Sequence, residues 1–160
     1  MTEIRNYIRE GVPLIETTEH VDELPSHEKF ALAVVISQGE VLMVNNAEKG
    51  RAWEYPGGKL EEGEEFIDAA RREFREETGY RLVRPVPACV VSETYVSVNR
   101  EHHTDGVVYT GELGERIGEG EEKIEELRFF NELPEELTRI TFDRDTFEKI
   151  RRRAEEKTKE

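Results

Sequence analysis

The sequence predicts an α/β domain, and three observations indicate that class. Stretches rich in Val, Ile and Leu at residues 30–36, 41–45 and 86–98 have the length and composition of β-strands. Residues 64–78 and 143–157 carry apolar side chains at the spacing of amphipathic helices. The chain has 160 residues, which suits one domain with a substantial core.

The first part of the chain is predicted to form strands. Residues 12–15 indicate a short strand that precedes a polar connection. The apolar stretches at residues 30–37 and 41–45 are separated only by Gln38-Gly39-Glu40, which predicts a β-hairpin.

The second half of the chain is predicted to hold further strands and a terminal helix. In order these are strands at 81–83 and 86–98 interrupted by Pro85 and Pro87, a strand at 106–112, a mobile glycine- and glutamate-rich loop at 111–126, a strand at 127–130, a turn or short helix at Pro134, and a helix from 143 to about 157. Asp143 or Asp145 would cap that helix, because a carboxylate there accepts hydrogen bonds from free backbone N–H groups.

The composition restricts the partners and the compartment of the protein. The formal net charge of −14 disfavours a duplex nucleic acid, whose binding depends on Lys and Arg contacts to phosphates. The longest apolar stretch is too short to span a membrane, and the first residues do not resemble a secretory signal. Cys89 is the only cysteine and lies in an apolar stretch, so we expect a buried thiol and no disulfide. We expect a cytoplasmic protein without a membrane partner.

The helix predicted at residues 64–78 places three carboxylates together. Two glutamates, Glu76 and Glu77, follow Glu73 by three and four residues. Residues at these spacings lie on one side of a helix, so the three carboxylates cluster. Like charges at that spacing destabilise an isolated helix, and a divalent cation would explain why they are gathered. Mg²⁺ and Mn²⁺ prefer oxygen ligands, and Mg²⁺ commonly bridges carboxylates to substrate phosphates. The sequence therefore predicts a Mg²⁺ or Mn²⁺ site and a polyphosphate substrate.

The residues before this helix favour the same site. Trp53-Glu54-Tyr55 predicts a short strand, and Pro56-Gly57-Gly58 predicts a tight turn after it. Glycine has no side chain to block the approach of an ion or a phosphate to the backbone. Gly79, directly after the helix, is a typical helix end.

The segment at residues 58–80 resembles the Nudix hydrolase signature at every fixed position. Gly58 is followed after five residues by Glu64, and after seven more by Arg72 and the residues through Tyr80. The resemblance implies a single Nudix domain over residues 1–160, with a mixed β-sheet sandwiched between helices. It also implies metal-dependent hydrolysis of a nucleoside diphosphate linked to another group. The residues Trp53 to Lys59 are similar to those of the MutT-like members.

The resemblance implies roles for individual residues. Glu73, Glu76 and Glu77, with the Gly57 carbonyl, would hold the metal. The spacing adds a role for Arg72, which lies eight residues after Glu64 and four before Glu76, so it can pair with either and keep part of the acidic cluster in place. The general base varies within the family: a motif glutamate would correspond to Glu73 or Glu76, and the later-loop candidates are Glu119, Glu121 and Glu122.

Three residues beside the motif are candidates for substrate binding, each with a structural alternative. Lys59 could contact a phosphate or face solvent. Trp53 and Tyr55 could line the nucleotide pocket or pack in the core.

Several substrates stay open on the resemblance. A nucleoside triphosphate comes first, ahead of ADP-ribose or a dinucleoside polyphosphate, and removal of pyrophosphate from RNA 5′ ends is a further alternative. A nucleotide-sensing module without turnover is the alternative from another class. The family resemblance also makes a homodimer plausible.

Overall fold

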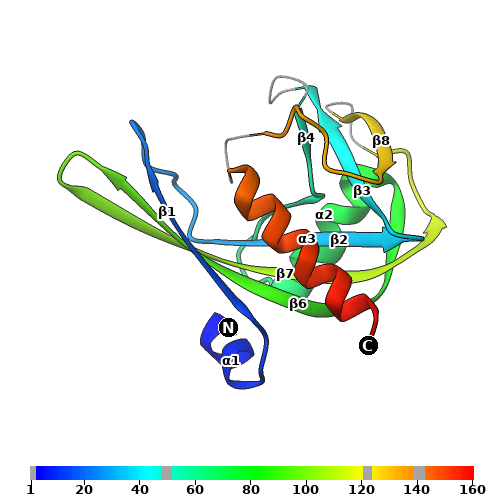
Figure 1. Ribbon diagram of the computed structural model, residues 1–160, viewed down its shortest axis with the longest axis horizontal. Helices are drawn as coiled ribbons and strands as arrows, with labels where there is room; N and C mark the ends of the chain where they lie inside the picture. Colours follow the sequence, from blue (N-terminus) through cyan, green and yellow to red (C-terminus); the bar gives the residue numbers. More distant parts are fainter. Residues whose placement is uncertain (1–2, 48–51, 121–123, 139–142) are drawn as a thin grey trace.

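The computed structural model describes residues 3–47, 52–120, 124–138 and 143–160 (Figure 1). The elements, in chain order, are α1 (Ile4–Arg9), β1 (Leu14–His20), β2 (Lys29–Ser37), β3 (Glu40–Asn46), β4 (Ala52–Glu54), β5 (Gly57–Lys59), α2 (Phe66–Thr78), β6 (Tyr80–Ser97), β7 (Arg100–Arg116), β8 (Ile124–Phe130) and α3 (Arg144–Thr158). In the part of the chain that these ranges cover, no helix is long and apolar enough to cross a membrane.

The strands form one mixed sheet with the order β1-β6-β7-β2-β3-β4. The pairs β1–β6 and β2–β7 are parallel, whereas β6–β7 and β2–β3 are antiparallel. Two further strands lie off this path: β5 pairs with β2, and β8 pairs with β3. The predicted hairpin is confirmed, since Ile36 faces Val41 across the β2–β3 turn.

Helices cover both faces of the sheet, and alternate residues of β2 separate the two cores (Figure 1). Ala31 and Val35 belong to the core beneath α2, which contributes Phe66 and Phe74. The other core, beneath α3, contains Leu32 and Val34 of β2 together with Trp53, Tyr55, Phe147 and Ile150. The period of two along a strand explains this division. The structure thus confirms the predicted class of a mixed sheet between helices.

The two long helices form close to their predicted limits. α2 begins at Phe66, where the Glu65 backbone N–H donates to the Asp68 carboxylate at 3.0 Å. It ends at Gly79, whose φ of 81° lies in the left-handed region that glycine tolerates best. α3 is capped by Asp143, which accepts a hydrogen bond from the Thr146 backbone N–H.

The structure corrects three expectations about local structure. Residues 81–97 lie in one strand, because the pairing with β7 continues past Pro85 and Pro87 through shifts in register. Residues 111–116 belong to β7 and are not loop. Gly57 and Gly58 lie in β5, paired with β2, and do not form the expected turn.

Helix α1 was not predicted. Ile4, Tyr7 and Ile8 follow helical spacing, but a run of six residues is too short for that period to stand out in the sequence.

Candidate functional site

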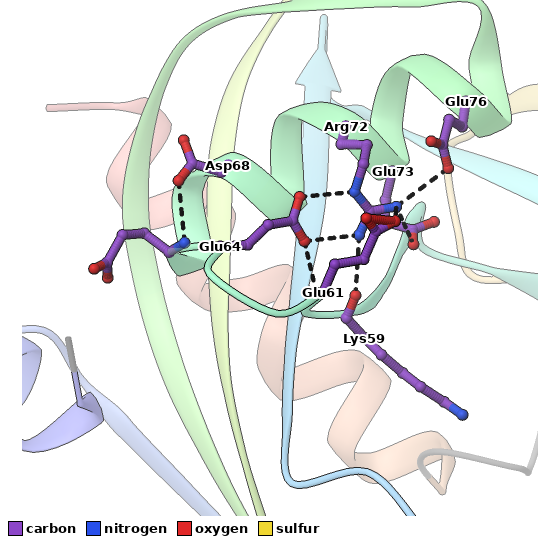
Figure 2. Close-up of polar contacts among 8 residues, drawn as sticks. Lys59, Glu61, Glu64, Asp68, Arg72, Glu73 and Glu76 are labelled. Carbon is purple, nitrogen blue, oxygen red and sulfur yellow. Dashed lines mark hydrogen bonds and ion pairs between the residues drawn. The ribbon is translucent and has the colours of Figure 1, made fainter. Parts of the chain in front are cut away.

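Arg72 lies at the centre of the carboxylates that the sequence singled out (Figure 2). Its Nε and Nη2 donate to the two oxygens of Glu64 at 2.7 and 2.9 Å. Its Nη1 donates to Glu73 at 2.9 Å and to Glu76 at 3.2 Å. Nη2 also reaches the Lys59 carbonyl at 3.1 Å. One guanidinium therefore joins the loop before α2, strand β5 and two successive turns of α2.

The ion pair between Arg72 and Glu64 fixes the charge of both groups. The hydrogen bond from Arg72 holds the pKa of Glu64 below its usual range. The same bond raises the pKa of Arg72, which stays cationic. Both side chains are only 16% exposed, so water screens this pair less than it screens a surface pair. Arg72 is thus the fixed cation around which the carboxylates are arranged.

Glu77 connects the end of α2 to strand β5. Its side chain is buried, with only 3% of the residue exposed, and it accepts a hydrogen bond from the Gly57 backbone N–H at 2.7 Å. A carboxylate buried at this depth is costly unless hydrogen bonds compensate it. The predicted ligand Glu77 and the predicted backbone ligand Gly57 therefore lie side by side.

Gly58 is required because the Glu73 carboxylate lies directly against it. A Cβ at this position would lie 2.5 Å from Glu73 Oε1 and 2.6 Å from its carboxyl carbon. Any other residue would displace that carboxylate. The glycine at the start of the motif thus leaves room for the first glutamate of the cluster.

The residues at this site fit a hard divalent cation in donor chemistry. Within the described ranges, no three His, Cys, Asp or Glu side chains are already positioned to hold a metal ion. Glu73 and Glu76 do converge on one cationic nitrogen, Arg72 Nη1, and the Glu77 carboxylate lies at the neighbouring strand. Carboxylate and backbone oxygens are the ligands that Mg²⁺ and Mn²⁺ prefer.

The predicted substrate-binding residues have different environments. Trp53 and Tyr55 are buried in the core beneath α3, as the structural alternative expected. The Tyr55 hydroxyl donates to the Phe147 carbonyl at 2.7 Å. The Lys59 side chain is exposed and lines a cavity of about 500 Å³ formed by residues 26–29 and 59–62. Lys59 thus lines a cavity, whereas Trp53 and Tyr55 belong to the core.

The loop candidates for the general base are only partly described. Glu121 and Glu122 lie outside the described residues. Glu119 is exposed, and its segment packs on the end of α2, where the N–H groups of Ile117 and Gly118 both donate to the Gly79 carbonyl. The chain therefore enters the loop directly beside the turn that carries Glu77.

Sequence reasoning missed three contributions to the site. Glu61 Oε1 lies 3.4 Å from Arg72 Nη1, and the Lys59 contribution to Arg72 is a backbone carbonyl. Lys29 and His27 line the cavity beside Lys59 although they precede the motif by about thirty residues. The pairing of β2 with β5 brings these segments together, since Phe30 faces Lys59. No spacing within the motif could have indicated that contact.

The comparisons with known proteins match this geometry. The NUDIX domain model matches residues 26–153. An RNA pyrophosphohydrolase of Bartonella bacilliformis is 57% identical over 77 residues, which are 43% of this chain and 45% of that protein. An RNA pyrophosphohydrolase of Roseobacter denitrificans is 38% identical over 79 residues, 49% of this chain and 48% of that protein. The chain thus matches less than half the length of either relative.

A solved structure supports the same assignment. The MutT NUDIX hydrolase of Burkholderia pseudomallei aligns with 73% of this chain and 94% of its own, with a TM-score of 0.59 and 27% identity. The match of the family model covers every strand of the sheet except β1, together with α2 and most of α3. With its motif, its fold and most of its length in agreement, this chain belongs to the NUDIX domain family.

Proposed function

We propose that this chain catalyses the metal-dependent hydrolysis of a pyrophosphate bond in a nucleoside 5′-polyphosphate. One observation carries the proposal: Arg72 gathers Glu64, Glu73 and Glu76 beside Gly58, in a chain of the NUDIX family. This arrangement presents carboxylate oxygens at the strand-to-helix connection. A module that binds nucleotides without turnover would not need Glu73 and Glu76 to be held against the same nitrogen of Arg72.

Four groups would hold the metal: the carboxylates of Glu73, Glu76 and Glu77 and the Gly57 carbonyl. A bound Mg²⁺ or Mn²⁺ would neutralise phosphate charge and lower the pKa of the attacking water. Arg72 positions Glu73 and Glu76 and keeps Glu64 ionised. Glu73, Glu76, Glu121 and Glu122 are the candidates for accepting the proton of that water.

The substrate would lie in the cavity beside β5. The exposed Lys59 lines it, so it offers an ammonium group to phosphates next to the acidic cluster. This supports a nucleoside triphosphate as the first candidate, with ADP-ribose and dinucleoside polyphosphates behind it. The two relatives named RNA pyrophosphohydrolases favour a second candidate, the 5′-triphosphate end of single-stranded RNA.

A substrate panel tests this proposal. Release of phosphate and pyrophosphate would be measured with Mg²⁺ or Mn²⁺ on nucleoside triphosphates, oxidised nucleotides, ADP-ribose, dinucleoside polyphosphates and triphosphorylated RNA. We expect turnover of one class that stops on chelation of the metal. Tight nucleotide binding without turnover of any compound would contradict the proposal and would indicate a sensing module.

A further inference from the structure

A second cavity, of about 600 Å³, lies along the outer side of α2 and is lined mainly by arginines. Its lining residues are Asp68, Arg71, Arg72, Arg75, Arg81, Leu82, Val83, Arg84 and Ile117. We name it the arginine groove. Five of these nine residues are arginines, and one is a carboxylate. Arg72 is already compensated by Glu64, Glu73 and Glu76, so any net positive charge of the groove comes from the other arginines.

The charges of the groove differ in how far they are neutralised. On β6, Arg81 pairs with Glu115 at 3.1 Å, and Arg84 pairs with Glu112. On α2, Arg71 and Arg75 are exposed and form no ion pair within the described residues. They lie four residues apart on one helix face, where like charges repel and destabilise the helix. An anionic ligand would relieve that repulsion.

The backbone of β6 directs a further arginine to this region. Arg84 has a φ of 49°, in the left-handed region that costs a residue other than glycine about 1 kcal/mol. It lies where the β6–β7 register shifts between Val83 and Val86. Such a bulge re-aims the side chain that it carries. Here that side chain lines the groove.

The groove meets the candidate active site at Arg72. This residue lines the groove and also donates to Glu64, Glu73 and Glu76. A ligand in the groove would therefore lie beside the acidic cluster. The distance along α2 between Arg71 and Arg75 is about 6 Å, comparable with the separation of successive phosphates along a nucleic-acid strand.

We infer that the arginine groove binds the backbone phosphates of a single-stranded RNA whose 5′-polyphosphate end lies at the acidic cluster. This inference rests on the proposed function and identifies RNA as its substrate class. Among the described residues, the groove is lined by no aromatic side chain on which a base could stack, and its apolar members are aliphatic. Guanidinium contacts to phosphate carry no sequence information. The groove therefore holds the strand without a preference for particular bases.

Equilibrium binding of a short single-stranded RNA with a 5′-monophosphate tests the groove without turnover, because that RNA has no pyrophosphate bond. Fluorescence anisotropy would compare wild type with the double variant Arg71→Gln, Arg75→Gln. At about 0.1 M salt we expect the affinity to fall on the order of tenfold, and the negative slope of log K against log salt to become shallower by about 1.4. Glutamine keeps the helix propensity, so α2 should be retained.

The matched control removes two arginines elsewhere. Arg152→Gln with Arg153→Gln changes the net charge equally but lies on α3, against the other face of the sheet. The inference predicts a clearly smaller loss of affinity in this control. Equal losses in both double variants, or none in either, would overturn it. A changed oligomeric state in the groove variant with unchanged RNA affinity would overturn it in favour of a contact between copies.

Turnover separates this inference from the proposed function. The groove variant should lose kcat/KM on both substrates to different extents: its fold-loss on triphosphorylated RNA should be at least about five times its fold-loss on a nucleoside triphosphate. The reason is that only RNA carries backbone phosphates beyond its 5′-triphosphate. Absence of turnover by wild type on every substrate would refute the proposed function, and the binding measurement would still decide the groove. Equal losses on both substrates would overturn the groove alone.

Discussion

Arg72 and Glu64 are joined by two parallel hydrogen bonds, Nε to Oε2 at 2.7 Å and Nη2 to Oε1 at 2.9 Å. The pair links the loop at residues 60–65 to the middle of α2 (Figure 2). Glu64 also accepts a hydrogen bond from the Glu61 backbone N–H at 2.7 Å. The loop is thus held by side-chain contacts to a helix whose other face is buried.

The first prediction concerns the shape of the Arg72 cation. Arg72→Lys keeps the charge but cannot form the two parallel bonds to Glu64 while contacting Glu73 and Glu76. We expect kcat/KM to fall at least about tenfold and the free energy of unfolding to fall by about 1–2 kcal/mol. Steady-state kinetics and denaturant unfolding measure both. Arg5→Lys, at an exposed arginine of α1, is the control, and equal effects of the two changes would contradict this role of Arg72.

The second prediction concerns Gly58. Gly58→Ala places a Cβ within 2.5 Å of Glu73 Oε1, and the carboxylate is the far end of a flexible side chain that can move away. We therefore expect a small change in Tm and a loss of kcat/KM of at least about tenfold. Gly118→Ala is the matched control, because nothing lies within 4 Å of a Cβ there. An active Gly58→Ala enzyme would show that the position of Glu73 is unimportant.

The third prediction separates the charge of Glu77 from its hydrogen bond to Gly57. Glu77→Gln keeps an oxygen acceptor for the Gly57 N–H, so the free energy of unfolding should change by less than about 1 kcal/mol. Without the negative charge, kcat/KM should fall at least about tenfold. Glu77→Ala also leaves that N–H without its acceptor and should cost a further 1–3 kcal/mol, roughly. Full activity of Glu77→Gln would rule out a role for this charge.

The fourth prediction concerns a buried carboxyl on β6. Glu93 is 1% exposed and accepts hydrogen bonds from Tyr95 at 2.9 Å and Thr104 at 2.8 Å. Burial raises the pKa of Glu93 to about 7, and the charge of Glu19 on β1 acts in the same direction. The folded state therefore holds its proton more tightly than the unfolded state. The resulting stability is fully present below the unfolded pKa and is lost as the pH rises through about 7.

Glu93→Gln should remove this pH dependence, which amounts to about 2–3 kcal/mol between about pH 5 and about pH 8. Thermal unfolding of wild type and variant at both pH values measures this difference in stability. The variant should gain stability relative to wild type at the higher pH. Glu16→Gln, an exposed carboxyl on β1, is the control. The same pH response in wild type and in Glu93→Gln would contradict the account.

The sequence predicted those parts of the fold that follow from local patterns. The limits of α2 were close, because apolar spacing and Gly79 act within the helix itself. The β2–β3 hairpin was predicted from its short connection. The prediction that Pro85 and Pro87 interrupt the strand was wrong, because the long pairing of β6 with β7 accommodates both prolines through register shifts. Such pairing depends on a partner distant in sequence.

The site shows the same division. The contacts of Arg72 with Glu64 and Glu76 follow from spacing in and just before one helix, and they were predicted. The approach of Glu73 to Gly58 and of Glu77 to Gly57 depends on the packing of α2 against β5, which spacing alone does not reveal. The arginine groove is formed by α2, the start of β6 and Ile117, which follows β7. These segments come together only in the fold, and the net charge of −14 gave no indication of a local group of arginines.

The most direct test of the central claim compares Glu76→Gln with Glu10→Gln in a Mg²⁺-dependent assay of phosphate or pyrophosphate release. Glu76 contacts Arg72 at the proposed metal site, whereas Glu10 is an exposed residue that follows α1. Wild type and Glu10→Gln should turn over a nucleoside polyphosphate only with added metal, and Glu76→Gln should lose at least about a hundredfold in kcat/KM. Near-normal turnover by Glu76→Gln at saturating Mg²⁺ would contradict the central claim.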